Sequence, residues 1–269
     1  MKPILLRMDD VGAASKQYEQ YAKLSMGKRV LIPPAHSPFN WFGIKRTRLL
    51  RGWGPYPELT LPQWEKIMAV LQKHQAKVTL GVTAAWVERD GSLTPFAQKY
   101  PHQAACLREA AAAGLIEIAN HGLTHCVLAG KKYLPHRLAA NRLYHREFWD
   151  WVPAAVHREH IFRAQELLQA AFGVDVVTFI PPGHVFTPAT EAHAKQAGLK
   201  YLSATVSLAP TGQRGGLRYI SLPDVTAFHD REIVLAGISW LEMLLTEHRG
   251  NHFMTIAEYG AMRDDGDWQ

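Results

Sequence analysis

Short polar segments directly follow apolar, strand-like runs in this chain. These segments are residues 7–10 (Arg-Met-Asp-Asp), 120–125 (Asn-His-Gly-Leu-Thr-His) and 228–230 (Phe-His-Asp). The first follows the run 4–6, and the second follows the run 115–119. In α/β folds with a mostly parallel sheet, functional residues gather at the carboxyl ends of the strands. The chain is therefore constrained to a fold in which these strand ends can meet.

Asp9, Asp10, His121 and His125 are candidate residues for a metal site. One carboxylate and two imidazoles suit zinc and related divalent metals, and three protein ligands leave a position for water. Neighbours on an extended segment point in different directions, so one aspartate can bind the metal while the other accepts a proton. His-x-x-x-His places both rings on one helix face or on either side of a tight turn. The simpler interpretation of Asp9-Asp10 is a turn or a helix cap, but the joint pattern favours a catalytic metal site.

Apolar runs typical of strands alternate with segments typical of helices. Strands are expected at 4–6, 77–83, 115–119, 174–180, 200–204 and 219–223, with a last strand near the C-terminus. Helices are expected at 60–74, 101–113, 188–197 and 232–247, and residues 136–172 are expected to be mostly helical with a break at Pro153. This alternation predicts an α/β fold with a mostly parallel sheet and right-handed crossovers. Because 269 residues suit one α/β core, we expect a single domain over 1–269 with a long loop insertion at about 12–57.

Four segments together resemble the polysaccharide deacetylases (carbohydrate esterase family 4, NodB-homology domain). They are Asp-Asp-Val-Gly at 9–12, His-Gly-Leu-Thr-His at 121–125, Phe-Ile-Pro-Pro-Gly-His at 179–184 and Phe-His-Asp at 228–230. Their order and rough spacing match, and segment 253–259 resembles the final strand and turn of that fold. The resemblance covers the chain from about residue 4 to about residue 260. It implies a distorted (β/α) barrel of about seven mostly parallel strands.

The resemblance also implies a role for each candidate residue. Asp9 is expected to be the general base, and Asp10, His121 and His125 are expected to bind the metal. His229 is expected to act as the general acid toward the leaving amine. The divalent metal, zinc with cobalt, nickel, iron or manganese as alternatives, would activate water and polarise the acyl carbonyl. The implied reaction removes an acyl group, N-acetyl in the first instance, from a sugar, nucleotide sugar or glycan conjugate.

Departures from the family pattern point to a divergent branch. Ile180 stands where most members have an arginine that pairs with the catalytic aspartate. Arg7, Arg163 and His184 are candidates for orienting the base in its place. Residues 7–8 also replace the usual Thr-Phe of the first motif. A non-catalytic carbohydrate-binding protein that retains the fold is therefore an alternative, as is a deformylase or another C–N hydrolase that uses the same site.

Candidate substrate contacts lie in two regions. Pro182, Gly183 and His184 follow a strand-like run. Trp41 and Arg46 belong to a region that mixes basic and aromatic side chains, which can cover a sugar ring and meet phosphate or carboxylate groups. Such a mixture can also bind single-stranded nucleic acid or form a solvated loop, but no recognised nucleic-acid motif accompanies it. With the net charge of +6, we expect an acylated sugar or glycan carrying phosphate or carboxylate, and no nucleic-acid partner.

The remaining sequence features concern the cellular compartment. No stretch of about 18 apolar residues is present, so no membrane span is expected. The apolar run at the N-terminus is too short for a signal peptide. Two cysteines, Cys106 and Cys126, cannot form a disulfide framework and are expected to be reduced. These features predict a cytoplasmic protein.

Overall fold

The computed structural model describes residues 3–18, 24–26, 29–31, 44, 56–88, 90–127, 146–205, 211–221 and 224–264. Nine strands of this described part form the main sheet. They are β1 (Ile4–Val11), β4 (Val78–Val82), β7 (Ile116–Asn120), β8 (Thr178–Phe179), β9 (Tyr201–Leu202), β10 (Gly212–Arg214), β11 (Leu217–Tyr219), β12 (Val225–His229) and β13 (Phe253–Met254). Their order is β10-β11-β9-β8-β7-β4-β1-β12, and β13 pairs with β1 outside this order.

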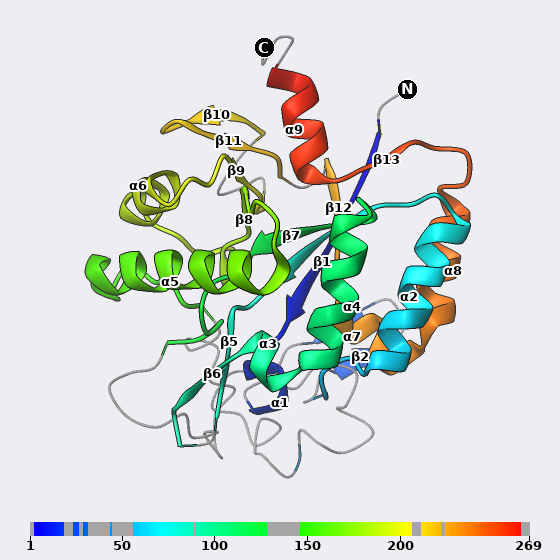
Figure 1. The fold of residues 1–269 in the computed structure, drawn as a ribbon, viewed down its shortest axis with the longest axis horizontal. Coiled ribbons are helices and arrows are strands. Elements are labelled where there is room, and N and C mark those ends of the chain that lie inside the picture. The colour runs from blue at the N-terminus through cyan, green and yellow to red at the C-terminus, as the bar shows by residue number, and fades with distance from the viewer. Residues whose placement is uncertain are drawn as a thin grey trace.

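Parallel pairing dominates the sheet. Only β10 and β11 form an antiparallel pair among its described strands, and the other pairs are parallel. The expected α/β fold, a distorted (β/α) barrel of mostly parallel strands, is confirmed: the sheet curls into a half-barrel covered by helices (Figure 1). Because the strands are parallel, their carboxyl ends meet at one end of the half-barrel.

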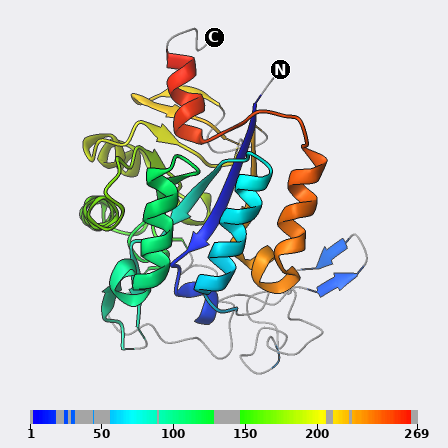
Figure 2. The same cartoon turned by 45° about the vertical axis from the view of Figure 1, so that its right-hand side comes forward.

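Helices surround the sheet. They are α2 (Leu61–Lys73), α3 (Phe96–Lys99), α4 (Pro101–Ala112), α5 (Ala154–Phe172), α6 (Pro188–Gln196), α7 (Asp230–Ala236), α8 (Ile238–Glu247) and α9 (Ile256–Asp264). Helix α2 packs against α4 and α8, and α5 packs against α4 and α6. Figure 2 shows α4 (green), α2 (cyan) and α8 (orange) as one row beside the sheet. The start of β1 and helix α9, near the two ends of the described chain, lie opposite the carboxyl end of β1 (Figure 1).

Strand β1 explains the two-sided packing of the sheet. Alternate side chains of a strand point to opposite faces. Leu6 and Met8 join the large apolar core, whereas Leu5 joins a second cluster that includes Ile256 and Tyr259 of α9. Helix α9 therefore fills the inside of the half-barrel near the amino end of β1, which leaves the carboxyl end for polar residues.

Several expected elements agree with the structure and others need correction. The helices expected at 60–74, 101–113 and 188–197 are confirmed as α2, α4 and α6. The helix expected at 232–247 is divided because Gly237, with φ 83°, breaks it into α7 and α8. The segment 136–172 was expected to be mostly helical with a break at Pro153: helix α5 does follow this proline, but the described residues 146–153 before it form turns.

Strand lengths were the least accurate predictions. The first strand continues past residue 6 to Val11. The strand expected at 174–180 is only Thr178–Phe179, because a run of buried β-branched residues indicates burial rather than the length of backbone pairing.

The region expected as a loop insertion, 12–57, contains short elements where the structure describes it. They are α1 (Ser15–Tyr18) and the antiparallel hairpin of β2 (Leu24–Met26) and β3 (Arg29–Leu31). Trp41 and Arg46 lie outside the described residues. A second hairpin joins β5 (Ala85–Val87) to β6 (Leu93–Pro95). Among the helices of the described part, none is long and apolar enough to span a membrane.

Candidate active site

The polar segments that follow the strands meet at the carboxyl end of the half-barrel. Asp9 and Asp10 lie in the last residues of β1, and His121 directly follows β7. His229 ends β12 and is the register partner of Asp9 on the neighbouring strand. The fold therefore brings together residues that are far apart in the sequence, as parallel strands do.

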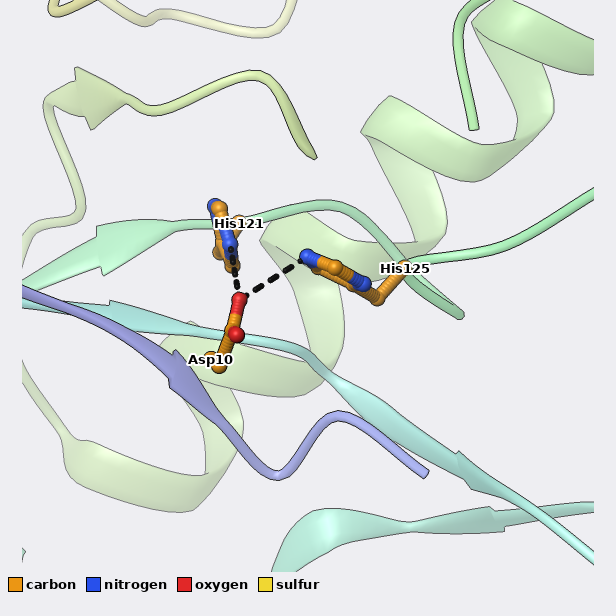
Figure 3. A group of neighbouring side chains, drawn as sticks. All are labelled: Asp10, His121 and His125. Atoms are coloured by element: carbon orange, nitrogen blue, oxygen red, sulfur yellow. Dashed lines mark ion pairs between the residues drawn. The ribbon is translucent and has the colours of Figure 1, made fainter. Parts of the chain in front are cut away.

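Asp10, His121 and His125 form a group that can hold a metal ion. Each offers one ligand atom, and these atoms lie within 4.8 Å of one another. Nε2 of His121 is 3.5 Å from Oδ1 of Asp10, and Nε2 of His125 is 3.0 Å from the same oxygen. Figure 3 shows both imidazoles directed at this carboxylate. All three side chains are buried.

The state of the imidazole nitrogens fits a divalent metal. The buried Nε2 of His121 has no hydrogen-bond partner. The opposite nitrogens are held in place, since Nδ1 of His121 lies 2.6 Å from the carbonyl oxygen of Ile180 and Nδ1 of His125 lies 2.9 Å from Oγ of Ser15. Contacts of this kind orient metal-binding histidines and select the tautomer. One carboxylate and two Nε2 atoms suit zinc and its neighbours.

Backbone geometry separates the two aspartates. The register between β1 and β4 shifts between Met8 and Val11, and Asp10 has a φ of 72°. A left-handed residue at a bulge redirects its side chain. Asp10 therefore faces the two histidines, while Asp9 remains on the inner face of β1.

One carboxylate oxygen of Asp9 accepts a hydrogen bond, and the other has no hydrogen-bond partner. Its Oδ2 pairs with Nη2 of Arg7 at 2.8 Å, whereas the buried Oδ1 has no hydrogen-bond partner. Burial alone would raise the pKa of Asp9, but the positive charge of Arg7, with contributions from His121 and His229, lowers it below its ordinary value. Asp9 is thus an ionised carboxylate with a free oxygen beside the candidate metal group.

A single buried glutamate organises the loop that carries the two histidines. The backbone N–H groups of Leu123, Thr124 and His125 donate to the Glu147 carboxylate at 2.9–3.3 Å. His160 pairs with the same carboxylate. The sequence analysis assigned no role to Glu147 or His160, because nothing local links either residue to the histidine motif.

A buried charged cluster supports Asp10 from the other side. Nζ of Lys16 donates to the carbonyl oxygen of Asp10 at 2.9 Å and pairs with Glu58 at 2.7 Å and with Asp230. The hydroxyl of Tyr56 donates to Asp230 at 2.8 Å and lies 3.4 Å from Oδ2 of Asp10. Burial, which Lys16 only partly offsets, raises the pKa of Asp230 to about 8. The sequence offered no signal for Lys16, and Asp230 stood out only as the neighbour of His229.

The residues after β8 lie beside the site. Pro182, Gly183 and His184 form a 3₁₀ turn, and a Cβ on Gly183 would lie 2.6 Å from Cγ of Arg146. Burial, together with the positive charge of Arg7, lowers the pKa of His184 to about 4, and its Nδ1 has no partner. His184 is therefore neutral at neutral pH.

His184 also borders a cavity of about 360 Å³. Its lining includes Trp149, Phe186, Asp150 and Glu191. Aromatic faces and carboxylates are groups that contact sugar rings and hydroxyls. The other expected site residue, His229, is half-buried, and its backbone N–H donates to Glu232 at 2.9 Å.

Structure comparisons give matches at low sequence identity. A putative polysaccharide deacetylase from Mycobacterium smegmatis has a TM-score of 0.56 at 13% identity, covering 97% of this chain and 88% of that chain. A cobalt-bound family 4 acetyl xylan esterase from Clostridium thermocellum has a TM-score of 0.45 at 16% identity, covering 78% of this chain and 88% of that one. A 4-alpha-glucanotransferase from Thermococcus litoralis has a TM-score of 0.49 at 15% identity, and the match covers 75% of this chain but only 37% of the transferase.

Sequence comparison identifies the family. No curated protein sequence matches the chain. The family model for polysaccharide deacetylase matches residues 56–202, which is more than half of the chain. This match agrees with the half-barrel and with the grouping of Asp10, His121 and His125 at its carboxyl end. The chain belongs to the polysaccharide deacetylase family.

Proposed function

We propose that the protein is a metal-dependent hydrolase, with a single catalytic domain, that removes an acyl group from a sugar, nucleotide sugar or glycan conjugate. The observation that carries this proposal is the free Oδ1 of Asp9 beside the group of Asp10, His121 and His125. A carboxylate next to a three-ligand site is the arrangement that metal-assisted hydrolysis requires. N-acetyl is the proposed acyl group, and zinc is the proposed metal, with cobalt, nickel, iron and manganese as alternatives.

The residues around the site have separate roles in this proposal. A divalent metal held by Asp10, His121 and His125 would polarise the acyl carbonyl and lower the pKa of water. Asp9 accepts the proton of the attacking water at Oδ1, since its lowered pKa keeps it ionised at neutral pH. His229 donates a proton to the leaving amine from the neighbouring strand end. Glu147 holds the backbone of the histidine loop during these steps.

The described lining narrows the proposed substrate. The cavity beside His184 includes Trp149 and Phe186, which suit the apolar face of a sugar ring, and the carboxylates Asp150 and Glu191. Neither lysine nor arginine is among the lining residues of this described cavity. A phosphate or carboxylate group on the substrate would therefore bind outside this cavity, and Arg46 remains the proposed contact for such a group.

The first experiment measures metal content and acyl release together. The wild type is expected to hold about one divalent ion per chain, as three-ligand sites do, and to release acetate from N-acetylated amino sugars or their oligomers. The double variant His121→Ala/His125→Ala should lose both properties, while His102→Ala, an exposed change on α4, should keep both. Absence of metal in the wild type would overturn the proposal.

The role of Asp9 separates catalysis from simple binding. Asp9→Asn should keep the metal but lower kcat by at least about 100-fold, the usual contribution of a general base. If the metal-loaded wild type releases formate from N-formylated amino sugars but no acetate from N-acetylated ones, the protein is a deformylase. If it binds metal and glycans but releases no acyl group, it is a non-catalytic carbohydrate-binding protein.

A further inference from the structure

We infer that Arg7 is the positioning residue for Asp9, holding one carboxylate oxygen so that the other faces the reacting groups. This inference deepens the proposed function, on which its catalytic consequence rests. The pairing itself stands on the geometry of described residues. Nη2 of Arg7 lies 2.8 Å from Oδ2 of Asp9, and Nη1 donates to Oγ of Ser203 at 2.9 Å.

The position of Arg7 follows from strand geometry. Residues two apart on a strand point to the same face, so Arg7 and Asp9 of β1 both point into the half-barrel. Arg7 is fully buried, which prevents it from contacting substrate directly. Its guanidinium spans the interior to Ser203, just after β9, and the N–H of Ser203 is bonded to Phe179. The anchor is therefore part of the sheet framework.

Among the described residues, Arg7 donates the hydrogen bond that holds Oδ2 of Asp9, and an apolar side chain packs near Oδ1. A Cβ atom on Gly81 would lie 3.2 Å from the buried Oδ1 of Asp9 and 3.4 Å from Cδ1 of Ile180. Ile180 thus packs near the carboxylate but cannot donate a hydrogen bond. Arg163 is exposed on α5. The other sequence candidate, His184, is kept neutral by its lowered pKa of about 4 and therefore cannot form an ion pair with Asp9.

The pairing has a consequence for the chemistry. A carboxylate held at one oxygen by a planar guanidinium loses rotational freedom. Oδ1 of Asp9 is then left without a partner. The Cβ position of Gly81, which lies near this oxygen, is also 3.3 Å from Cγ of His121, so the free oxygen is on the side of His121. Arg7 therefore orients the base toward the group of metal-binding residues without taking part in the reaction.

A double-mutant cycle in stability tests the pairing without any activity. Arg7→Met should raise the unfolding equilibrium constant by about 100-fold or more, because Asp9 is left as an unpaired buried charge. Adding Asp9→Asn should recover most of that loss, with a coupling of at least about ten-fold. Arg158→Met, an exposed arginine that stacks on Phe162, is the matched control and should show no coupling to Asp9→Asn. Additive effects would overturn the pairing, as would failure of both Arg7→Met and Arg7→Met/Asp9→Asn to fold.

Activity and structure then test the positioning role. In metal-loaded Arg7→Met, kcat should fall by about 100-fold with KM nearly unchanged, the penalty of a misplaced catalytic group, and Arg7→Lys should recover part of it. A crystal structure should show the Asp9 carboxylate rotated in Arg7→Met. An unchanged kcat or an unmoved carboxylate would overturn positioning. Absence of acyl release by the wild type would overturn the proposed function alone, because the stability cycle and the carboxylate orientation would still decide the role of Arg7.

Discussion

At the scale of single residues, Lys16 shows how the site is supported by charge. Its ammonium group is fully buried between Glu58 and Asp230, and it also donates to the backbone of Asp10. These carboxylates outweigh burial and raise the pKa of Lys16 above its ordinary value. Burial, together with the neighbouring carboxylates of Glu58 and Asp10, raises the pKa of Asp230 although Lys16 opposes this shift. The buried negative charge of this cluster is therefore compensated only while Lys16 is present.

Removing this charge should strongly destabilise the protein. Lys16→Met leaves buried carboxylates unpaired and should lower the free energy of unfolding by about 3–5 kcal/mol. Lys73→Met is the control, because Lys73 forms an exposed pair with Glu242 and should change the free energy by less than about 1 kcal/mol. Urea unfolding measures both. Equal effects of the two substitutions would contradict a balanced buried cluster.

His160 predicts a pH dependence of stability. Burial lowers its pKa, but the Glu147 carboxylate outweighs burial and raises the pKa above the ordinary value of 6.5. The protonated ring is therefore favoured in the folded state, and its stabilising contribution is fully present below the unfolded pKa. It is lost as pH rises through the higher folded pKa.

The comparison of wild type with His160→Gln should reveal this dependence. The difference in unfolding free energy should be largest below about pH 6.5 and should shrink as pH rises above that value. His102→Gln, an exposed change on α4, should give a difference that hardly varies with pH. A difference for His160→Gln that grows with rising pH would show that the Glu147 pair does not form.

At the scale of elements, the loop after β7 depends on a glycine. Gly122 has a φ of 79°, and a Cβ there would lie 2.0 Å from Oε2 of Glu147. The absence of a side chain lets the carboxylate reach the N–H groups of the residues that follow. His125 also takes a left-handed conformation, with φ 59°. The histidine motif therefore forms a tight turn, which was one of the two geometries open from its spacing.

Gly122→Ala should disturb both the loop and the metal site. It should lower the free energy of unfolding by about 1–3 kcal/mol more than Gly173→Ala, because the added methyl group clashes with Glu147. Gly173 is the matched control, since it has a similar φ of 67° but nothing within 4 Å of its Cβ position. Metal affinity, measured by titration with zinc, should fall only in Gly122→Ala. Equal stability losses would show that Glu147 does not occupy this position.

At the scale of the whole molecule, the site joins distant segments of the chain. Arg7 and Ser203 are 196 residues apart, and Lys16 and Asp230 are 214 residues apart. One candidate ligand, Asp10, lies on β1, and the two histidines lie in the loop that follows β7, another strand of the same sheet. A metal bound there would link these strands, so binding should stabilise the entire fold.

Metal addition should therefore raise the melting temperature. At a zinc concentration about 100 times Kd, the stabilisation should be about 2.7 kcal/mol if the unfolded chain does not bind zinc. Calorimetry with and without a chelator measures the effect. His121→Ala/His125→Ala should melt at the same temperature in both conditions, and a metal-dependent shift in that variant would place the binding site elsewhere.

The sequence by itself determined the α/β class, the family and the candidate ligands. Strand and helix periodicities are local, and polar residues after strand-like runs mark the carboxyl ends of a parallel sheet. This is why α2, α4 and α6, and the nearness of Asp10 to His121, could be predicted. Substrate contacts at Trp41 and Arg46 stay predictions, because they lie outside the described residues.

Only the tertiary structure decided which side chains support the candidate ligands. Glu147, Lys16 and Asp230 act through contacts between segments that no periodicity connects. Arg7 was one of three candidates for a partner of Asp9, and packing of the inner face of β1 separated it from the exposed Arg163. Burial made the difference: a charged group inside the half-barrel must find a partner wherever the fold places one.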